Sequence, residues 1–241
     1  MRLCIDLASQ GQNFESNPLW YIGSKPLHHW LQVKNRHPRK LGSTSSRVSP
    51  HNELIWALIG LCLTIVGTLI PAFFTNMPWY WSNQGVTSYP LGVSFQIGAV
   101  LLVGCLGGKN AGALSQIAYL VIGLSGLSVF SDGGGLGYLS KPSFGYLLGF
   151  VPGAWLCGYL AFQSKARLES LAFSGFCGLS TIHFFGFSYL LGLQIFNPAH
   201  RGIITFFQYV WDYSIYLFPG QMAVLCAVSL LAFCLRRIMF Y

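Results

Sequence analysis

The chain has 241 residues, of which 53% are hydrophobic and only 8% are charged. Soluble domains carry about 25% charged residues, so a surface this poor in charge excludes an ordinary water-soluble protein. The formal net charge is +8, but half of the basic residues lie in the first fifty positions and the others separate apolar segments. This distribution predicts an integral membrane protein and argues against nucleic acid as a partner.

Residues 1–50 are polar and irregular in composition, with Gly, Ser, Asn and Pro scattered among seven Lys and Arg residues. They lack the apolar stretch of a signal peptide. We expect a basic, disordered tail on the cytoplasmic side of the membrane, facing the lipid headgroups.

Residues 51–241 contain the apolar segments, and about 20 apolar residues are enough for a helix to cross the hydrocarbon layer. We predict an all-α fold in this domain, a bundle of six transmembrane helices. The expected spans are about 54–74, 90–106, 110–130, 143–163, 168–192 and 215–235. An even number of spans places both chain ends on the same side.

The basic residues between the spans indicate the orientation of the bundle. With the tail inside, the inner connections carry Lys109, Lys165 and Arg167, and the terminal segment carries Arg236 and Arg237. The outer connections carry only Lys141 and Arg201. Because basic residues concentrate in cytoplasmic loops, both chain ends are expected to be cytoplasmic.

A glycine-rich connection, residues 131–143, precedes the fourth predicted span and lies on the outer side in this topology. Glycine-rich turns at helix starts often bind phosphate, but this one lacks the Lys-Ser/Thr ending of an ATPase loop. The hydrolase patterns GxSxG and HExxH are absent as well. None of the seven cysteines forms a CxxC pair, and we expect them to act as small buried residues. We therefore predict no enzyme activity, metal or cofactor.

Small residues recur at helical spacing in two predicted spans, as in closely packed membrane helices. In the fourth span they are Gly145, Gly149 and Gly153, which we interpret as packing inside the bundle. In the first span they are Ala57, Gly60, Thr64 and Gly67. This first-span stripe fits packing inside the bundle and contact with a partner subunit equally well. His183, inside the fifth span, is interpreted as a hydrogen-bonded core histidine rather than a proton relay.

Residues 90–150 resemble the biotin-transporter BioY family, the substrate-binding S components of energy-coupling-factor (ECF) transporters. The matching positions are Pro90, Gln96, Tyr119, Leu120, Gly123, Gly126, Leu127, Val129, Phe130, Gly133, Gly134, Gly135, Pro142, Gly145, Tyr146, Leu147, Gly149 and Phe150. A looser resemblance continues to residue 237. The chain departs from the family pattern at Ser128, Lys141, Ser143 and Phe144, and also at Gln221 and Val224, where the family has an acidic residue and a lysine.

The resemblance implies an outward-facing cavity for biotin under the loop after the third span. Gln96, Tyr146 and Gln221 are then expected to bind the ureido ring, and Tyr119, Phe130, Phe144 and Phe150 to form apolar walls. Ser143 is a further expected substrate-binding residue. Gly133, Gly134 and Gly135 are expected to cover the ligand and, with Lys141, to bind its carboxylate.

The resemblance also implies a transport cycle. Biotin is bound from the outside and released inside a bacterial cytoplasmic membrane, driven by a transmembrane T component and ATPase subunits. Two alternatives stay open, an S component for another small vitamin or heterocycle and a non-transporting membrane protein or intramembrane enzyme.

Overall fold

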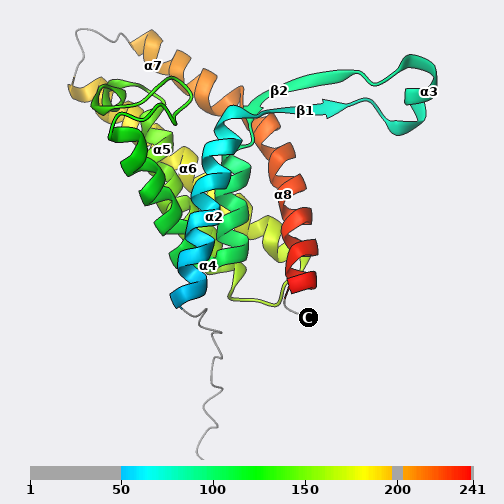
Figure 1. Cartoon of the computed structure of the whole chain (residues 1–241). Coiled ribbons are helices and arrows are strands. Elements are labelled where there is room, and N and C mark those ends of the chain that lie inside the picture. The colour runs from blue at the N-terminus through cyan, green and yellow to red at the C-terminus, as the bar shows by residue number, and fades with distance from the viewer. Residues whose placement is uncertain (1–49, 197–202, 240–241) are drawn as a thin grey trace, which may run out of the picture. The chain divides into compact units, whose positions relative to one another are not determined.

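The computed structural model describes residues 50–196 and 203–239, and the structural statements below concern these two ranges. The predicted basic tail falls on residues 1–50 and so lies almost wholly outside the described residues. The described part is mostly helical, and five helices are long and apolar enough to cross a membrane: His51–Leu69, Gln96–Leu124, Phe144–Ala161, Leu168–Phe196 and Ile204–Met239. Figure 1 shows them gathered into one bundle. The prediction of a helical membrane domain is confirmed.

The helix α4 (Gln96–Leu124) reverses its direction in the middle. Gly108 has a φ of 82°, which only glycine adopts readily. A Cβ built on Gly112 would lie 3.3 Å from the Cα of Gly104, whereas a straight helix would separate two such residues by about 12 Å. Segments 96–107 and 109–124 therefore run antiparallel, and both pack on α2 (Pro50–Leu69).

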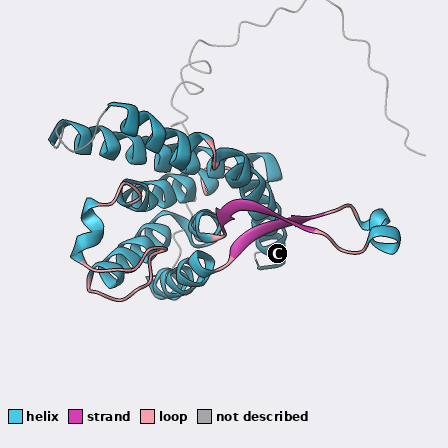
Figure 2. Cartoon of the chain, turned by 90° about the horizontal axis from the view of Figure 1, so that it is seen from above, coloured by secondary structure: helices cyan, strands magenta, loops and turns pink. Residues whose placement is uncertain are grey.

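A two-stranded hairpin, which the sequence did not reveal, connects α2 to α4. It comprises β1 (Pro71–Thr75), η1 (Pro78–Tyr80), α3 (Trp81–Gln84) and β2 (Ser88–Ser94). The strands are antiparallel, with Phe74 opposite Tyr89. We call residues 71–94 the hairpin arm, and Figures 1 and 2 show it reaching sideways away from the helices.

The hairpin arm corrects two predicted span boundaries. The expected spans 54–74 and 90–106 run into β1 and β2, whereas the helices end at Leu69 and begin at Gln96. Pro71 and Pro90 have no backbone N–H to give to a helix, and Gly92 has a φ of 72°. An apolar composition continued through these residues, but their backbone does not allow a continuous helix.

The remaining helices are α5 (Phe144–Ala161), α6 (Leu168–Phe196), α7 (Ile203–Val210) and α8 (Phe218–Met239), with a π-helical turn, η3 (Trp211–Ile215), between the last two. The glycines of α5 face α6. A Cβ on Gly149 would lie 2.9 Å from the Cα of Ile182, and one on Gly153 would lie 2.7 Å from the Cγ1 of the same residue. The packing interpretation of this glycine stripe is therefore confirmed.

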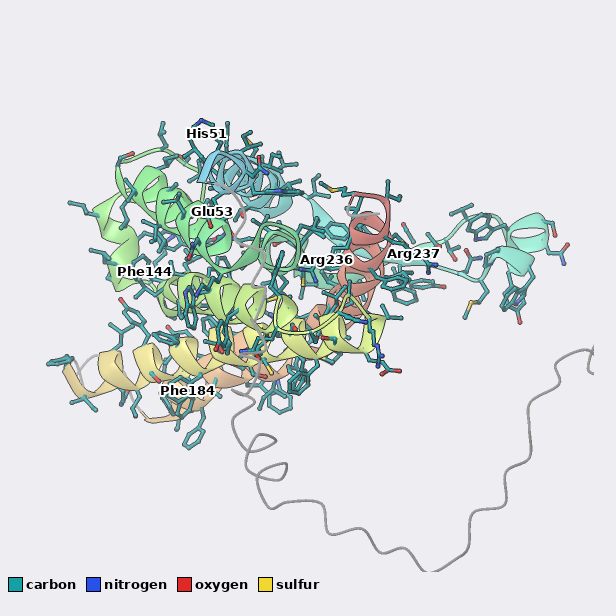
Figure 3. The ribbon with its side chains drawn as sticks, turned by 90° about the horizontal axis from the view of Figure 1, so that it is seen from below. His51, Glu53, Phe144, Phe184, Arg236 and Arg237 are labelled. Carbon is teal, nitrogen blue, oxygen red and sulfur yellow. The ribbon has the colours of Figure 1, made fainter. Side chains whose placement is uncertain are left out.

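The two ends of the bundle differ in charge. The basic end holds the start of α2, the Gly108 turn, the 162–167 connection and the end of α8. There Arg236 is buried, donates a hydrogen bond from Nη1 to the Ala161 carbonyl oxygen (2.8 Å) and stacks over Phe162, whereas Arg237 is exposed (Figure 3). The loop end, opposite, holds the last turns of α2 and α4 and the first turn of α5.

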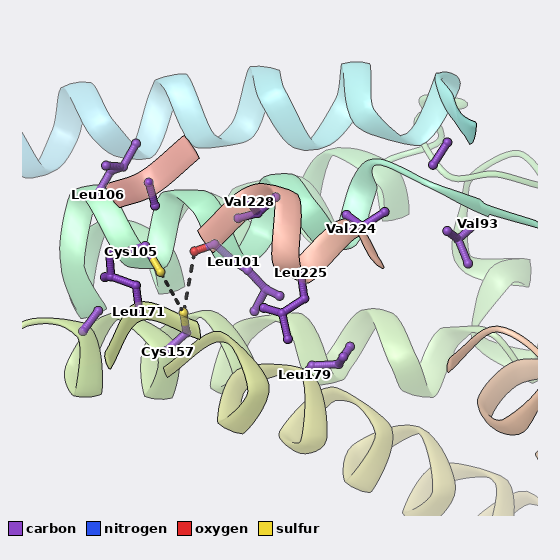
Figure 4. Packing of buried hydrophobic residues seen from close by; sticks show 13 residues of the cluster. Val93, Leu101, Cys105, Leu106, Cys157, Leu171, Leu179, Val224, Leu225 and Val228 are labelled. Atoms are coloured by element: carbon purple, nitrogen blue, oxygen red, sulfur yellow. Dashed lines mark hydrogen bonds between the residues drawn. The ribbon is translucent and has the colours of Figure 1, made fainter. Parts of the chain in front are cut away.

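An aliphatic cluster fills the bundle between α4, α5, α6 and α8 (Figure 4). Cys105 and Cys157 lie inside it, with their sulfur atoms 3.5 Å apart as free thiols. The interpretation as small buried residues is confirmed for these two. It is wrong for Cys62, Cys226 and Cys234, which lie on exposed faces of α2 and α8, where an apolar thiol is compatible with lipid contact.

Candidate ligand-binding site

A chain of aromatic rings lies at the loop end and joins α4, α5, α6 and the connection between α4 and α5. This connection, residues 125–143 in the structure, is called the glycine-rich connection from here on. Successive ring centroids are 5.3, 4.7, 6.4 and 5.8 Å apart in the order Tyr119, Phe130, Tyr138, Phe144 and Tyr189. The first four side chains are buried. We call these five rings the aromatic cluster. Aromatic walls of this kind are typical of pockets for small organic ligands.

Glycines allow the connection after α4 to fold down onto the aromatic cluster. A Cβ on Gly123 would lie 2.0 Å from the ring of Phe130, so only glycine leaves room for that ring. Gly134 lies directly over the Leu127 carbonyl oxygen, 2.2 Å from where its Cβ would be. Gly135 donates its N–H to the Gly123 carbonyl oxygen (2.8 Å). The connection is therefore tied to the end of α4 by backbone contacts that side chains would prevent.

The hydroxyl of Tyr119 is the centre of a first polar network. It accepts a hydrogen bond from Gln96 Nε2 (3.0 Å) and donates one to the Val129 carbonyl oxygen (3.0 Å). Thr68 Oγ1 lies 3.2 Å away. Because Tyr119 is fully buried, these contacts replace the water that the hydroxyl would otherwise bind. The network joins α2, both segments of α4 and the glycine-rich connection.

A second polar network joins α5, α6, η3 and α8. Tyr146 Oη lies 2.7 Å from Ser214 Oγ, which lies 3.2 Å from His183 Nδ1. His183 Nε2 lies 2.6 Å from Gln221 Oε1. Since the amide oxygen only accepts, Nε2 donates to it and Nδ1 of the neutral ring accepts from Ser214, which in turn accepts from Tyr146. Every hydrogen bond in this four-residue chain has a defined direction.

Glycines of α6 and α5 make space for the aromatic members of both groups. A Cβ on Gly186 would lie 2.4 Å from the Tyr146 ring, and a Cβ on Gly145 would lie 2.3 Å from Tyr189. Tyr146 also meets His183 edge-on, with ring centroids 5.8 Å apart. The same close helix packing that holds the bundle together therefore seats the second polar network.

The structure brings most of the predicted binding residues together. Tyr119, Phe130, Phe144, Tyr146 and Phe150 belong to one buried cluster. Gln96 reaches this cluster through Tyr119, and Gln221 reaches it through His183 and Ser214. Ser143 donates a hydrogen bond to the Tyr138 hydroxyl (3.2 Å). Burial raises the pKa of the Tyr138 phenol, which therefore stays neutral.

Lys141 faces the glycine-rich connection itself. Its Nζ donates a hydrogen bond to the Asp132 carbonyl oxygen (3.0 Å), lies 3.9 Å from the Asp132 carboxylate and sits over the Tyr138 ring at 4.9 Å. Its side chain is 40% exposed. Val224 packs against Gly98 in the aliphatic cluster.

Sequence reasoning missed Tyr138, Ser214 and the hydrogen bonds of His183. Tyr138 lies inside the glycine-rich connection, where ring burial depends on the fold of the backbone. Ser214 is preceded by charged and aromatic residues and carries no motif. The interpretation of His183 as a hydrogen-bonded core residue is confirmed, and its partners are Ser214 and Gln221.

The small-residue stripe of α2 is covered within the chain. Gly60 meets Val103 and Ser115 of α4, and Gly67 meets the Gln96 backbone nitrogen. Thr64 is fully buried beside Gln116 Nε2 (3.0 Å). Ala57 is 5% exposed. Of the two interpretations of this stripe, the structure supports packing inside the bundle, and contact with a partner subunit is wrong, because α4 already occupies that face.

These features define a class, a multi-pass helical membrane protein with a buried aromatic and hydrogen-bonding site at one end. The BioY family model matches residues 41–239. The chain belongs to the BioY family.

Individual relatives agree with this membership. The chain is 34% identical over 128 residues to the biotin transporter BioY of Thermotoga maritima, covering 52% of this chain and 75% of that protein. It is 28% identical over 188 residues to an uncharacterized 21.2 kDa protein of Cyanophora paradoxa, covering 77% of this chain and 95% of the relative. A crystal structure of the S-component for biotin from an ECF-type ABC transporter superposes with a TM-score of 0.57 at 18% identity, covering 78% of this chain and 92% of that one. The last similarity concerns the fold.

Proposed function

We propose that this chain binds biotin at the loop end of the bundle and carries it across a membrane as the S component of an ECF transporter. The observation that carries the proposal is the pair of polar networks beside the aromatic cluster, one buried and one partly buried, in a chain of the BioY family. Biotin transporters are named among its relatives from Thermotoga maritima and Rhizobium etli.

The chemistry of biotin matches the groups present. Its ureido ring has two N–H donors and one carbonyl acceptor, which Gln96, Tyr146 and Gln221 complement with amide and hydroxyl groups. Its sulfur-containing ring and aliphatic chain suit the rings of Tyr119, Phe130 and Phe144 and the neighbouring Phe150. The backbone N–H groups of Gly133, Gly134 and Gly135 are the candidate donors to its carboxylate. Lys141, the basic residue nearest to these glycines in the sequence, is the candidate cation.

The proposed topology has six crossings, with α4 crossing twice and the basic end facing the cytoplasm. The antiparallel segments of α4 support the extra crossing. The concentration of Lys109, Lys165, Arg167 and Arg237 at the basic end supports the orientation. Biotin then enters from the outer side of a bacterial cytoplasmic membrane, and release inside is driven by a T component and ATPase subunits.

Binding of labelled biotin to the purified chain in lipid nanodiscs tests the proposal. We expect saturable binding that weakens in Gln221→Leu, because this change removes an amide from the site and leaves His183 Nε2 without its acceptor. Tyr159→Phe is the matched control, since Tyr159 stacks on Trp155 beside Lys109, away from the site. A chain that binds no biotin saturably would contradict the proposal.

A different small heterocyclic vitamin is the second candidate ligand. It is favoured by Gln221 and Val224, which stand where the resemblance expects an acidic residue and a lysine. A competition assay separates the two candidates. Displacement of bound label by unlabelled biotin, and not by thiamine or riboflavin, supports biotin, whereas the reverse order supports the second candidate.

A further inference from the structure

The hairpin arm carries an unusual set of exposed side chains. Residues 71–94 contain no Asp, Glu, Lys or Arg. Eight of its large apolar side chains are between 43% and 69% exposed: Phe73, Phe74, Met77, Trp79, Tyr80, Trp81, Val86 and Tyr89. An exposed apolar surface of this size marks contact with a membrane or another protein. Exposing this much apolar surface to water is energetically unfavourable.

The position of the arm relates it to the ends of the membrane-crossing helices. β1 follows the last residue of α2 almost directly, and β2 leads into α4 within two residues. Figures 1 and 2 show the arm leaving the bundle sideways at the loop end, rather than continuing along the helices. If the helices cross the membrane, an arm in this direction lies along the membrane surface.

The backbone of the arm fixes how deep it can lie. Two paired strands leave the outer edge of each strand without backbone partners, and such edges are not tolerated in the hydrocarbon layer. A two-stranded hairpin is also only marginally stable in water by itself. The headgroup layer satisfies both conditions, because it offers water and polar groups to the edges and apolar contact to the rings.

The composition of the arm matches that layer. Trp and Tyr concentrate at both membrane–water interfaces, where a ring that is apolar at one end and polar at the other is favoured. Trp79, Tyr80 and Trp81 occupy the tip of the arm, and Phe74 stacks on Tyr89 across the strands (5.1 Å). The exposed side chains of α2, including Val66 and Leu69, continue the apolar surface from the bundle onto the arm.

We propose that the hairpin arm lies in the lipid headgroup layer beside the loop end and anchors the bundle there through Trp79, Tyr80 and Trp81. The arm holds the loop end at a fixed depth in the outer leaflet. Its internal hydrogen bonds maintain the tip, since Trp81 Nε1 donates to the Asn76 carbonyl oxygen (2.9 Å) and Asn76 Nδ2 donates to the Gly85 carbonyl oxygen (3.0 Å).

Quenching of tryptophan emission tests the depth of the arm. The full chain is reconstituted without biotin into phosphatidylcholine vesicles, with or without bromine on the shallow acyl carbons. Trp79→Phe is compared with the unmodified chain, so that the difference spectrum isolates Trp79, which is 69% exposed. We expect the emission of Trp79 to be lost in brominated vesicles and to resist the aqueous quencher acrylamide.

A second variant keeps the test decisive if the difference spectrum is weak. Met77→Glu places a charge beside the tip at a side chain that is 56% exposed, and we expect a shift of tryptophan emission to longer wavelength with less quenching by brominated lipid. Met77→Leu is its matched control and should change neither. Trp79 emission that acrylamide quenches and brominated lipid does not would overturn the proposal. So would protection that appears only at high protein density, which indicates a second copy, or only with biotin, which indicates a cover for the ligand.

Discussion

The two connections at the loop end turn their aromatic side chains in opposite directions. In the glycine-rich connection, Phe130 and Tyr138 are each 3% exposed, whereas Trp79 of the hairpin arm is 69% exposed. The difference follows from the helix that receives the rings. Gly123 leaves space for Phe130. In the arm, a Cβ on Gly85 would meet no atom within 4 Å, and one on Gly92 would only touch the edge of Tyr216 at 3.7 Å. Space on the receiving helix, rather than aromatic content, decides whether a connection becomes part of the site.

Among the variants considered, Gly134→Ala is expected to have the largest effect, because it should displace the glycine-rich connection from the aromatic cluster. Its Cβ would meet the Leu127 carbonyl oxygen at 2.2 Å, and a backbone atom cannot move aside as the end of a side chain can. We expect biotin affinity to fall at least tenfold, about 1.4 kcal/mol, as measured by binding in nanodiscs. Gly137→Ala is the matched control, because its Cβ meets no atom within 4 Å. Equal affinities in the two variants would show that the connection does not cover the ligand.

Tyr119→Phe is expected to have the next largest effect. It removes the hydroxyl that Gln96 and Val129 share and leaves the buried Gln96 amide without a partner. An unsatisfied buried polar group costs about 1–3 kcal/mol, which should lower the thermal unfolding midpoint in detergent and weaken biotin binding together. Tyr159→Phe, at an exposed tyrosine, should leave both unchanged. An unaltered midpoint for Tyr119→Phe would mean that water replaces the hydroxyl.

Which parts of this site the sequence predicts depends on the kind of interaction. The apolar segments predict the helices, and matched family positions such as Gln96, Tyr119 and Tyr146 predict residues that do meet in the structure. The hairpin arm was not predictable from hydropathy, since its strands contain no charged residue and adjoin the apolar helices directly, with Pro71, Pro90 and Gly92 as the signs of a break. The hydrogen bond between His183 and Gln221 joins residues 38 positions apart on different helices, and spacing along the chain contains no information about it.

Lys141→Met tests a smaller difference within the glycine-rich connection. Lys141 contacts Asp132 and the Tyr138 ring at the surface, and exposed ion pairs contribute about 0–1 kcal/mol. We expect at most a severalfold loss of biotin affinity if the lysine only stabilises the connection, and the loss should shrink at high salt. A loss as large as that of Gly134→Ala would instead place the lysine on the biotin carboxylate. Lys165→Met, in the connection at the basic end, is the control.

Removing the tip of the hairpin arm should have the smallest effect on binding and the clearest effect on membrane contact. Asn76 donates its backbone N–H to the Thr87 carbonyl oxygen (3.2 Å), so that an Asn-Gly turn in place of residues 77–86 can close the strands. We expect unchanged biotin affinity, because no residue of the aromatic cluster or of the two polar networks lies in the arm, and loss of the lipid-quenched tryptophan emission. A fall in affinity would mean that the arm covers the ligand. In that case the contrast between the two connections would describe the ligand-free bundle only.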